Sequence, residues 1–325
     1  MFIVTGANGF IGSQMVHFLN TKGITNIICI DSVTPLQRPQ PLATCDYSEF
    51  MQPAQIFDYL KNSGDEVQCL FHMGACSDTQ EMNIQFLHEN NTEYTNQLFQ
   101  ACCKLPQCTF IYASSGAIYG QGDKGFSDST PPDQFEPLNP YGWSKLNSDI
   151  WILEQLKKPQ RWYGLRFFNV YGPNEYHKKD MRSVVHKAYH QIIASGKLKL
   201  FKSYSPDYAD GKQMRDFIYV KDVTEWMWQI YLNKNLPSDI YNMGYGRART
   251  WLDLAKAVFD SLNKQLNIEW IDMPETLRPR YQYFTEAKMK KFLAQGMPSP
   301  KWSLEEGVED YVKNYLQKGD EDVHS

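Results

Sequence analysis

The sequence has no excess of charge of either sign that would point to a polyanionic partner. Its 325 residues include 33 Lys and Arg and 37 Asp and Glu, which gives a formal net charge of −4. No dominant Lys/Arg run interrupts this balance, so we expect no binding to nucleic acid. Apolar residues (42%) and charged residues (22%) occur in ordinary globular proportions. The length is enough for one large α/β domain or for two unequal lobes.

Long apolar segments are also missing. No apolar run approaches the roughly 20 residues that cross a bilayer. The start, MFIVTGANGF, lacks the basic and apolar regions of a signal peptide. We therefore expect a cytoplasmic protein without a membrane partner.

Paired cysteine motifs are absent as well. The seven cysteines lie between residues 29 and 108, and none of them has C-x-x-C spacing. Several fall in apolar stretches typical of buried strands or helices. We expect reduced thiols, with no disulfide framework and no metal site.

The first half of the chain alternates short β-branched stretches with amphipathic ones. The strand-like segment FIVTG at 2–6 is followed by a helical pattern, and a second strand-like segment, IICID at 27–31, comes after that pattern. The alternation continues as far as a helix that is expected from Pro140 to about Lys158. This order predicts an α/β fold: a Rossmann-like, doubly wound parallel sheet with a smaller, mainly C-terminal substrate-binding lobe.

We predict three units along the chain. An NADP-binding Rossmann domain comprises 1–170 with 216–243, and a substrate-binding lobe comprises 171–215 with 244–318. The lobe ends in a helical pattern, SLEEGVEDYVKNYLQKG, and a polar tail at 319–325 is expected to be disordered.

TGANGFIG at 5–12 follows the first predicted strand directly and opens a helix, which is the context of a dinucleotide-binding loop. Gly6, Gly9 and Gly12 would allow the tight turn and the close approach of the backbone to a pyrophosphate at the helix N-terminus. Asp31 ends the second strand, where a carboxylate would hold the ribose of NAD. Arg38 could instead meet the 2′-phosphate of NADP, so these residues leave the two cofactors open.

NPYGWSK at 139–145 has the features of a helix start. Asn139 suits the N-cap and Pro140 the first helical position. Tyr141 and Lys145 would then share one face, where the ammonium lowers the phenol's pKa towards that of a general acid or base. The spacing alone is common on surface helices, so it does not establish a catalytic pair.

Three separated features together resemble the extended short-chain dehydrogenase/reductase family, most of which act on nucleotide sugars. They are the glycine loop, YASSGAIYG at 112–120 with Ser115, and the Tyr141/Lys145 pair. The resemblance implies that Ser115, Tyr141 and Lys145 are catalytic.

Further segments resemble one branch of that family, the ADP-L-glycero-D-manno-heptose 6-epimerases. They are FHMGACSDTQE, NVYGPNEYHKKDM, KQMRDFIYVKDV, YNMGYGRARTW and RPRYQYFTEA, and the resemblance runs from residue 2 to about residue 315. It implies an isomerase that inverts C6″ of an ADP-heptose for lipopolysaccharide biosynthesis. It also implies tightly bound NADP, with NAD as the alternative, and assembly into a homo-oligomer.

The expected chemistry is transient oxidation. A carbinol carbon without an acidic C–H is inverted by removing its hydride and returning it to the other face of the 6″-ketone. Tyr141 would serve one face, and the resemblance places a second acid/base at Lys178. We expect Lys179 and the nicotinamide charge to help lower the Lys178 pKa. Without the resemblance, Lys178 would be interpreted as an exposed lysine in a charged loop.

The resemblance also implies two sets of binding residues. Together with the three glycines, cofactor contacts are expected from Phe10, Ile11, Asp31, Ser32, Arg38, Met73, Gly74, Ala75, Cys76, Ser77, Asn90, Lys145, Val170 and Lys178. Substrate contacts are expected from Ser115, Asn169, Asp180, Lys187, Phe201, Lys202, Ser203, Tyr204, Arg215 and Tyr281. Family members usually have an acidic residue in place of Met73, Ser in place of Asp180, His in place of Lys187, and a shorter segment before Arg215.

Other readings remain at this stage. A UDP-hexose 4-epimerase would use a single tyrosine and have no use for Lys178. A 4,6-dehydratase needs an acid and a carboxylate base after its active-site Ser or Thr, but Gly116, Ala117 and Ile118 follow Ser115. A non-catalytic NADP-binding module would tend to lose the Ser/Tyr/Lys set.

Overall fold

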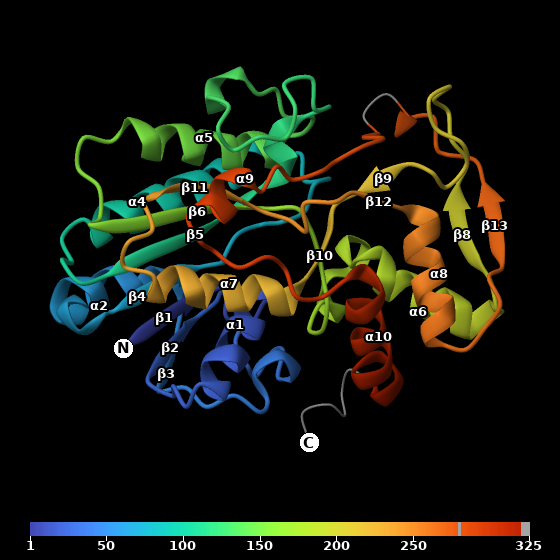
Figure 1. Cartoon of the computed structure of the whole chain (residues 1–325). Helices are drawn as coiled ribbons and strands as arrows, with labels where there is room; N and C mark the ends of the chain where they lie inside the picture. The colour runs from blue at the N-terminus through green and yellow to red at the C-terminus, as the bar shows by residue number, and fades with distance from the viewer. Residues whose placement is uncertain (279–280, 320–325) are drawn as a thin grey trace.

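The central element is a parallel β-sheet of seven strands. The computed structural model describes residues 1–278 and 281–319, and the strand order is β11-β6-β5-β4-β1-β2-β3 (Figure 1). The strands are β1 (Phe2–Thr5), β2 (Ile27–Ile30), β3 (Glu49–Met51), β4 (Cys69–His72), β5 (Thr109–Ser115), β6 (Arg161–Phe167) and β11 (Asp239–Met243). Every neighbouring pair is parallel. The predicted Rossmann-like fold is confirmed.

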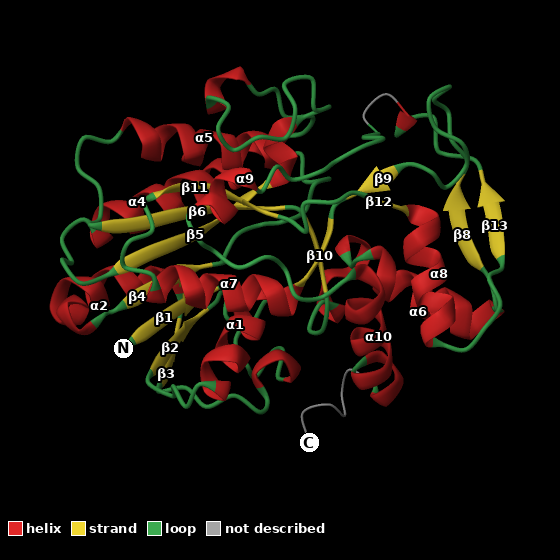
Figure 2. Cartoon of the chain, in the orientation of Figure 1, coloured by secondary structure: helices red, strands yellow, loops and turns green. Residues whose placement is uncertain are grey.

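Helices cover both faces of this sheet, as Figure 2 shows. Successive strand residues point to opposite faces, and both faces are buried: Ile3 packs into one hydrophobic cluster and Val4 into the other. The Val4 face is covered by α1 (Phe10–Thr21) and α7 (Val220–Leu232). The Ile3 face is covered by α2 (Ile56–Ser63), α4 (Tyr94–Cys102) and α5 (Pro140–Glu154).

The strand order reverses at β1, which lies between β2 and β4. At such a point the loops leaving neighbouring strands run to opposite faces and leave a crevice at the carboxyl ends. The helical connection after β4 contains α3 (Ile84–Leu87), a π-helical turn (His88–Glu93) and α4. The crevice between β1 and β4 therefore lies directly beside the glycine loop.

A second group of elements lies to one side of the sheet (Figure 1). It contains α6 (Val184–Ser195), β8 (Leu198–Phe201), α8 (Trp251–Ser261), β13 (Ile268–Ile271) and α10 (Leu304–Asn314). These helices share a separate hydrophobic cluster. Two short two-stranded ribbons connect the central sheet with this second group of elements. One pairs β7 (Asn169–Tyr171) with β10 (Phe217–Tyr219), and the other pairs β9 (Met214–Arg215) with β12 (Arg249–Thr250).

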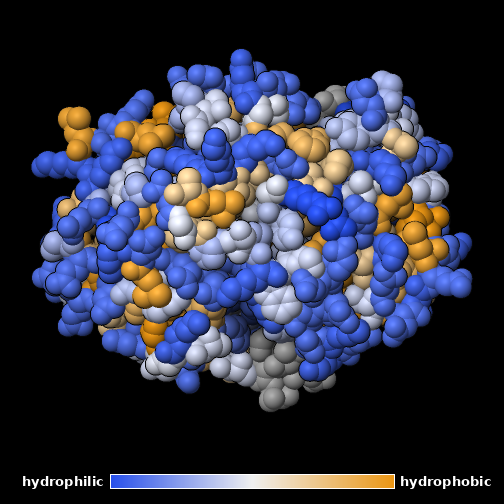
Figure 3. Space-filling model, in the orientation of Figure 1, coloured by the Kyte–Doolittle hydropathy of each residue, from blue (hydrophilic) through white to orange (hydrophobic). Residues whose placement is uncertain are grey.

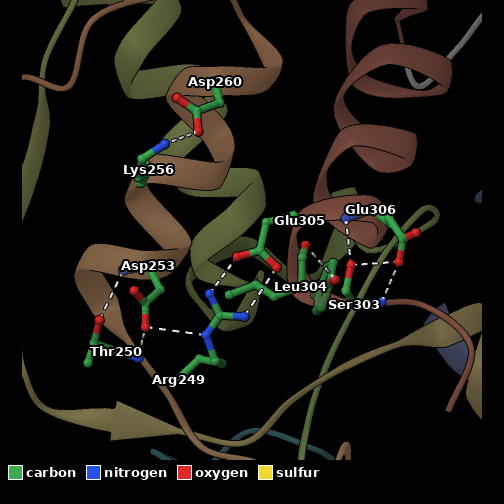
Figure 4. Close-up of polar contacts among 10 residues, drawn as sticks. Arg249, Thr250, Asp253, Lys256, Asp260, Ser303, Leu304, Glu305 and Glu306 are labelled. Carbon is green, nitrogen blue, oxygen red and sulfur yellow. Dashed lines mark hydrogen bonds and ion pairs between the residues drawn. The ribbon is translucent and has the colours of Figure 1, made fainter.

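Arg249 ties the starts of α8 and α10 together (Figure 4). Its guanidinium bonds both carboxylate oxygens of Glu305 and also Asp253, at 3.3 Å from Nε to Oδ2. Each helix begins with a capping box, formed by Thr250 with Asp253 in α8 and by Ser303 with Glu306 in α10. The segment that leads into Trp251 is therefore held both by the capping box of α8 and by the ion pair between Arg249 and Glu305 of α10.

Two predicted helices are shorter than expected. α5 ends at Glu154 rather than near Lys158, because Gln155 is extended and Pro159 disfavours helix in the residue before it. α10 ends at Asn314, and a 3-10 turn (Leu316–Lys318) follows.

The predicted division into domains stays a prediction. Its Rossmann part supplies all seven sheet strands. Within the predicted lobe, however, Ala287, Met289, Phe292 and Met297, around α9 (Lys290–Ala294), pack into the cluster on the α1/α7 face of the sheet. The expected disorder of the tail falls on 320–325, beyond the described residues.

Polar side chains dominate the surface. On the face drawn in Figure 3, hydrophobic residues form small groups among hydrophilic ones. Within 1–278 and 281–319, no helix has both the length and the apolar character needed to cross a bilayer. All seven cysteines are free thiols, and the described part of the chain groups no three His, Cys, Asp or Glu side chains as a metal site would.

A buried ion pair links α5 to the sheet. Arg166 Nε lies 3.0 Å from Asp149 Oδ2, and the two side chains are 1% and 0% exposed. Asp149 also accepts hydrogen bonds from the hydroxyls of Tyr112 (2.9 Å) and Ser114 (3.0 Å). This network holds the helix that carries Tyr141 and Lys145 against β5 and β6.

Replacing Arg166 with Met should lower the free energy of unfolding by about 3–5 kcal/mol, because Asp149 is left as an uncompensated buried charge. Lys256→Met is the control: it breaks an i,i+4 pair with Asp260 whose side chains are 66% and 59% exposed. That change should cost no more than about 0.5 kcal/mol. Denaturant titration measures both, and equal effects of the two substitutions would contradict the account.

Candidate active site

A cavity of about 1100 Å³ lies at the carboxyl ends of the sheet strands. It exceeds the range of about 300–1,000 Å³ usual for one small-molecule site, so it has room for a cofactor and a substrate together. Its walls come from the loops after β1, β4 and β5, and from lobe residues such as Val184, Trp251 and Leu254.

The glycine loop is shaped by contacts that no side chain would allow. Gly6 has φ +63°, and a Cβ there would lie 2.7 Å from the backbone of Gly74. A Cβ on Gly12 would lie 2.0 Å from the carbonyl oxygen of Gly6. Close backbone contacts therefore require glycine at both positions, and Gly74 is part of the same arrangement. The approach of this loop to a pyrophosphate stays a prediction.

The N-terminus of α1 faces the cavity through Gly9, Phe10, Ile11 and Gly12. Gly9 is the N-cap and offers no side-chain hydrogen bond, and the first turn contains no acidic residue. The first N–H groups of the helix are thus left for a ligand, and the helix dipole favours an anion. The fit is that of a pyrophosphate group.

Asp31, Ser32 and Arg38 line the same cavity beyond the glycine loop. The Asp31 carboxylate accepts from the backbone N–H of Asn8 (3.0 Å) and of Val33 (2.9 Å). Arg38 Nη1 donates to the Asn8 carbonyl at 2.8 Å, and the Asn8 side chain donates to the Arg38 carbonyl at 2.9 Å. Burial raises the Asp31 pKa, although these hydrogen bonds and Arg38 oppose the shift.

The loop after β4 brings Met73, Gly74, Ala75, Cys76 and Ser77 to the cavity wall. Asn91, in the π-helical turn, holds this loop by a reciprocal pair of hydrogen bonds with the Cys76 backbone, at 2.8 and 2.9 Å. It also donates to Ser144 Oγ on α5, at 3.0 Å. Its neighbour Asn90 was predicted as a cofactor contact and lines the cavity, whereas Asn91 was not predicted.

The helix that carries Tyr141 and Lys145, α5, begins as predicted. Asn139 Oδ1 accepts from Gly142 N at 2.8 Å, and Pro140 is the first helical residue. Tyr141 and Ser115 both line the cavity, and the Ser115 hydroxyl hydrogen-bonds the Tyr141 phenol. Burial raises the Tyr141 pKa, and the bond to Ser115 opposes this shift.

Lys145 does not act on the tyrosine as expected. Its Nζ donates to the Ala113 carbonyl at 2.9 Å, and Lys145 does not contribute to the Tyr141 shift. The expected lowering of the Tyr141 pKa is therefore wrong for this structure, because burial dominates and raises it. Burial also lowers the pKa of Lys145 to about 8, while Asp149 opposes the shift.

Lys178 lies in a short 3-10 helix (Tyr176–Met181) and lines the cavity with Tyr141. Its Nζ sits 5.3 Å from the centre of the Phe10 ring. Burial lowers the Lys178 pKa, and the buried Glu175 carboxylate opposes the shift. The expectation that Lys179 helps to lower this pKa is wrong for this structure, since Lys179 is exposed and burial is the cause. The expected contribution of the nicotinamide charge stays a prediction.

The predicted substrate residues fall into two groups. Ser115 and Asn169 line the cavity, and so does the cofactor residue Val170. The others lie outside its immediate wall: Asp180, Lys187, Phe201, Lys202, Ser203, Tyr204, Arg215 and Tyr281. Lys187 donates to the Asp180 carbonyl at 2.6 Å, and Arg215 is buried 5.3 Å from the Tyr281 ring and 5.6 Å from the Trp251 ring.

Several residues of the cavity wall were not predicted from the sequence. Trp251, Gln282 and Thr285 come from the lobe, and His177 and Arg182 flank Lys178 and Asp180. All of them except Arg182 lie within the segments that resemble the 6-epimerases, and that resemblance was the available signal. Tertiary folding brings them to the cavity from far along the chain.

The comparison with protein families agrees with this geometry. The sequence profile described as "NAD dependent epimerase/dehydratase family" matches residues 2–244. The chain belongs to the NAD dependent epimerase/dehydratase family. A nicotinamide dinucleotide is thus its cofactor, as predicted, without a distinction between NAD and NADP.

Full-length relatives within the epimerase/dehydratase family narrow the comparison. An ADP-L-glycero-D-manno-heptose-6-epimerase of Fusobacterium nucleatum is 43% identical over 98% of this chain and 99% of its own length. An enzyme of the same name from Nitratidesulfovibrio vulgaris is 46% identical over the same shares. The crystal structure of the Helicobacter pylori ADP-L-glycero-D-manno-heptose-6-epimerase is 26% identical, covers 96% of this chain and 94% of its own, and has a TM-score of 0.78. The predicted resemblance to these isomerases is confirmed.

The Lys145 pKa gives a testable pH dependence. The ammonium is present below pH 8 and is lost as the pH rises through about 8. Dinucleotide affinity should therefore fall by up to about 10-fold from pH 7 to pH 9, because the anionic cofactor loses a cation. Fluorescence titration of cofactor-stripped protein measures this Kd.

Lys145→Met is the matched control for that titration. It should bind the dinucleotide more weakly at pH 7 and show a flat profile across the same range. An identical pH profile in the two proteins would assign the dependence to another group.

Proposed function

We infer that the protein converts ADP-D-glycero-D-manno-heptose to ADP-L-glycero-D-manno-heptose by inverting C6″. The observation that carries this inference is the presence of two acid/base candidates from different elements, Tyr141 and Lys178, on one cavity. A two-sided inversion needs such a pair. The full-length relatives named as 6-epimerases support the choice of sugar.

The cofactor is held by the glycine loop, the N-terminus of α1 and the loop after β4. When bound, the dinucleotide would supply the reversible hydride chemistry at C6″ that inversion through a ketone needs. The remaining predicted cofactor contacts, including Ser32, Asn90 and Val170, line the same cavity. We propose NADP over NAD because the Asp31 carboxylate is already engaged by two backbone N–H groups, whereas Arg38 stands beside it.

Tyr141 Oη exchanges the proton of the C6″ oxygen on one face, and Ser115 orients that oxygen. The raised Tyr141 pKa means that the phenol holds its proton in the free protein. An anionic Tyr141 would need a nearby cation, which Lys145 supplies once its Nζ leaves the Ala113 carbonyl for the ribose and the phenol. Lys145 is thus proposed to act in binding and in proton transfer.

Lys178 Nζ exchanges the proton on the opposite face. Burial lowers its pKa and so favours the neutral amine more than in an exposed lysine; a neutral amine can accept a proton and its ammonium form can donate one. The buried Glu175, held by Ser183 N and Oγ at 2.5 Å each, keeps this segment in place. Lys178 is therefore proposed as a catalytic residue rather than as a surface lysine.

The substrate lobe binds the nucleotide end. Asn169 lies on the cavity wall, and Arg215 and Tyr281 stand behind Trp251. We propose that Arg215 meets the diphosphate, since a guanidinium binds phosphate oxygens in a fork. Contacts by Asp180, Lys187 and 201–204 require closure of the lobe over the substrate. The homo-oligomer and the cytoplasmic location stay predictions.

The test of the function is a panel of nucleotide sugars. ADP-D-glycero-D-manno-heptose should be inverted, as followed by NMR of C6″, while UDP-glucose and UDP-galactose should be unchanged. Interconversion of the two UDP-hexoses would establish a 4-epimerase instead. Bound dinucleotide without turnover of any of the sugars would establish a binding module.

For cofactor preference, Arg38→Ala should weaken NADP binding by about 1–3 kcal/mol and leave NAD binding nearly unchanged, because only the 2′-phosphate loses its partner. Arg247→Ala, an exposed arginine outside the cavity, is the control and should affect neither cofactor. Titration of stripped protein with both cofactors measures the effect. An equal loss for NADP and NAD would refute the preference.

Lys178→Met should slow inversion by about 10²–10⁴-fold, the usual contribution of a general acid/base, while the cofactor stays bound. Tyr141→Phe should slow inversion to a similar extent. Proton exchange on the face of C6″ that Lys178 serves should be retained in this variant. Single-turnover hydride exchange between the cofactor and a 6″-aldehyde analogue is measured for each bound orientation of the analogue. This measurement distinguishes the two faces of C6″. The neighbouring Lys179→Met serves as control, and a wild-type rate for Lys178→Met would leave a single-tyrosine mechanism.

A further inference from the structure

Gln213 is a buried polar residue for which the fold provides no partner. Its side chain is 0% exposed, and neither Oε1 nor Nε2 has a hydrogen-bond partner among residues 1–278 and 281–319. Leaving both ends of a carboxamide buried and unpaired is costly, and native proteins rarely do so without a reason. The unpaired amide therefore points to a partner that is not part of the described chain.

The position of Gln213 relates it to the active-site cavity. The β9–β12 ribbon pairs Arg215 with Arg249 and Met214 with Thr250, and it continues with Trp251 N donating to the Gln213 carbonyl at 3.2 Å. Residues 213 and 215 are two apart in an extended segment, so their side chains share one face. Arg215 lies over the Trp251 ring at 5.6 Å, which places Trp251 on that face too.

Trp251 connects this face of the ribbon with the active-site cavity, because Trp251 forms part of the cavity wall. Its indole Nε1 donates to the Tyr281 hydroxyl at 2.9 Å, and Arg249 with its bond to Glu305 fixes the chain just before it (Figure 4). Gln213 and Arg215 thus stand side by side behind a rigid aromatic wall. A ligand phosphate at Arg215 would bring the rest of its nucleotide next to Gln213.

Aromatic rings flank the same strand. Met214 N donates to the Tyr283 carbonyl at 2.8 Å, and the Tyr283 ring stacks on Tyr208 at 5.6 Å and 27°. Faces of this kind stack well on nucleobases. A carboxamide matches a base edge that presents one donor next to one acceptor, as the edges of adenine do. A phosphate offers acceptors only and would leave Oε1 unpaired.

We propose that Gln213 recognises the adenine of the nucleotide-sugar substrate, with Oε1 accepting from the 6-amino group and Nε2 donating to the adjacent ring nitrogen. This specificity role rests on the proposed function, because it assumes an adenosine diphosphate sugar. Gln213 is fully buried in this structure, so its side chain must become accessible when the nucleotide enters.

The test compares ADP with purine riboside 5′-diphosphate, which lacks the 6-amino group, by calorimetry on protein saturated with NADP. Wild type should prefer ADP by about 5- to 150-fold, the effect of one bidentate amide–adenine pair. In Gln213→Met the preference should fall to near unity, while the Tm of the free protein stays the same or rises because an unpaired buried amide has been removed.

Gln229→Met is the matched control, since that glutamine lies in α7 and already donates to Glu225 at 2.8 Å. It should keep the ADP preference and gain no stability. Equal binding of the two nucleotides by wild type overturns the proposal without any variant. A preference retained in Gln213→Met, or in Gln213→Leu if the first variant does not fold, also overturns it.

Two further outcomes are informative. A loss of affinity for 2′-deoxy-ADP in place of the purine analogue would show that the amide meets the ribose, and the adenine assignment would fall. Turnover of ADP-heptose without discrimination between the nucleotides would sink this inference and leave the proposed function standing. Discrimination between the two nucleotides without turnover of ADP-heptose would support this inference and contradict the proposed function.

Discussion

The site depends on the contact between two glycines. Gly6 leaves β1 and Gly74 leaves β4, and a Cβ on either one would lie within 3 Å of the other's backbone. Because neither has a side chain, the two loops that flank the point where the strand order reverses can touch. Their closeness lets the N-terminus of α1 and the loop held by Asn91 face one ligand from two sides. A methyl group at either position would push the loops apart and open the cradle.

Burial dominates the electrostatics of the proposed acid/base residues. It raises the pKa of Tyr141 and lowers those of Lys145 and Lys178, so burial favours the neutral form of each group. A phenol with a raised pKa holds its proton more firmly, whereas an amine with a lowered pKa releases its proton more easily. Tyr141 is thus suited to donate a proton and Lys178 to accept one. A bound nicotinamide dinucleotide would add its own charges beside these groups and would change their protonation equilibria.

Features set by local sequence could be predicted well. The glycine loop, the capped start of α5 and the strand–helix alternation each follow from a few neighbouring residues. The end of α5 was predicted too late, because the effect of Pro159 on the preceding residues was not weighed. The direction of the Tyr141 shift was also missed, since it depends on burial and on the Ala113 carbonyl that competes for Lys145.

Long-range features had no local signal. Arg215 was expected at the substrate, yet a sequence cannot show that it lies behind Trp251 rather than on the cavity wall. Gln213 gave no pattern at all, because an unpaired buried amide is recognisable only after the chain has folded around it. The return of 287–297 to the sheet is likewise a tertiary result, driven by apolar side chains that fit the α1/α7 face.

The central claim is that inversion proceeds by removal and return of one hydride. The most direct measurement is to run the reaction in D₂O with ADP-D-glycero-D-manno-heptose and examine C6″ of both epimers by NMR and mass spectrometry. The account predicts interconversion of the epimers with no deuterium at C6″, because the hydride never exchanges with solvent. Deuterium at C6″, or no interconversion by protein that carries its dinucleotide, would contradict it.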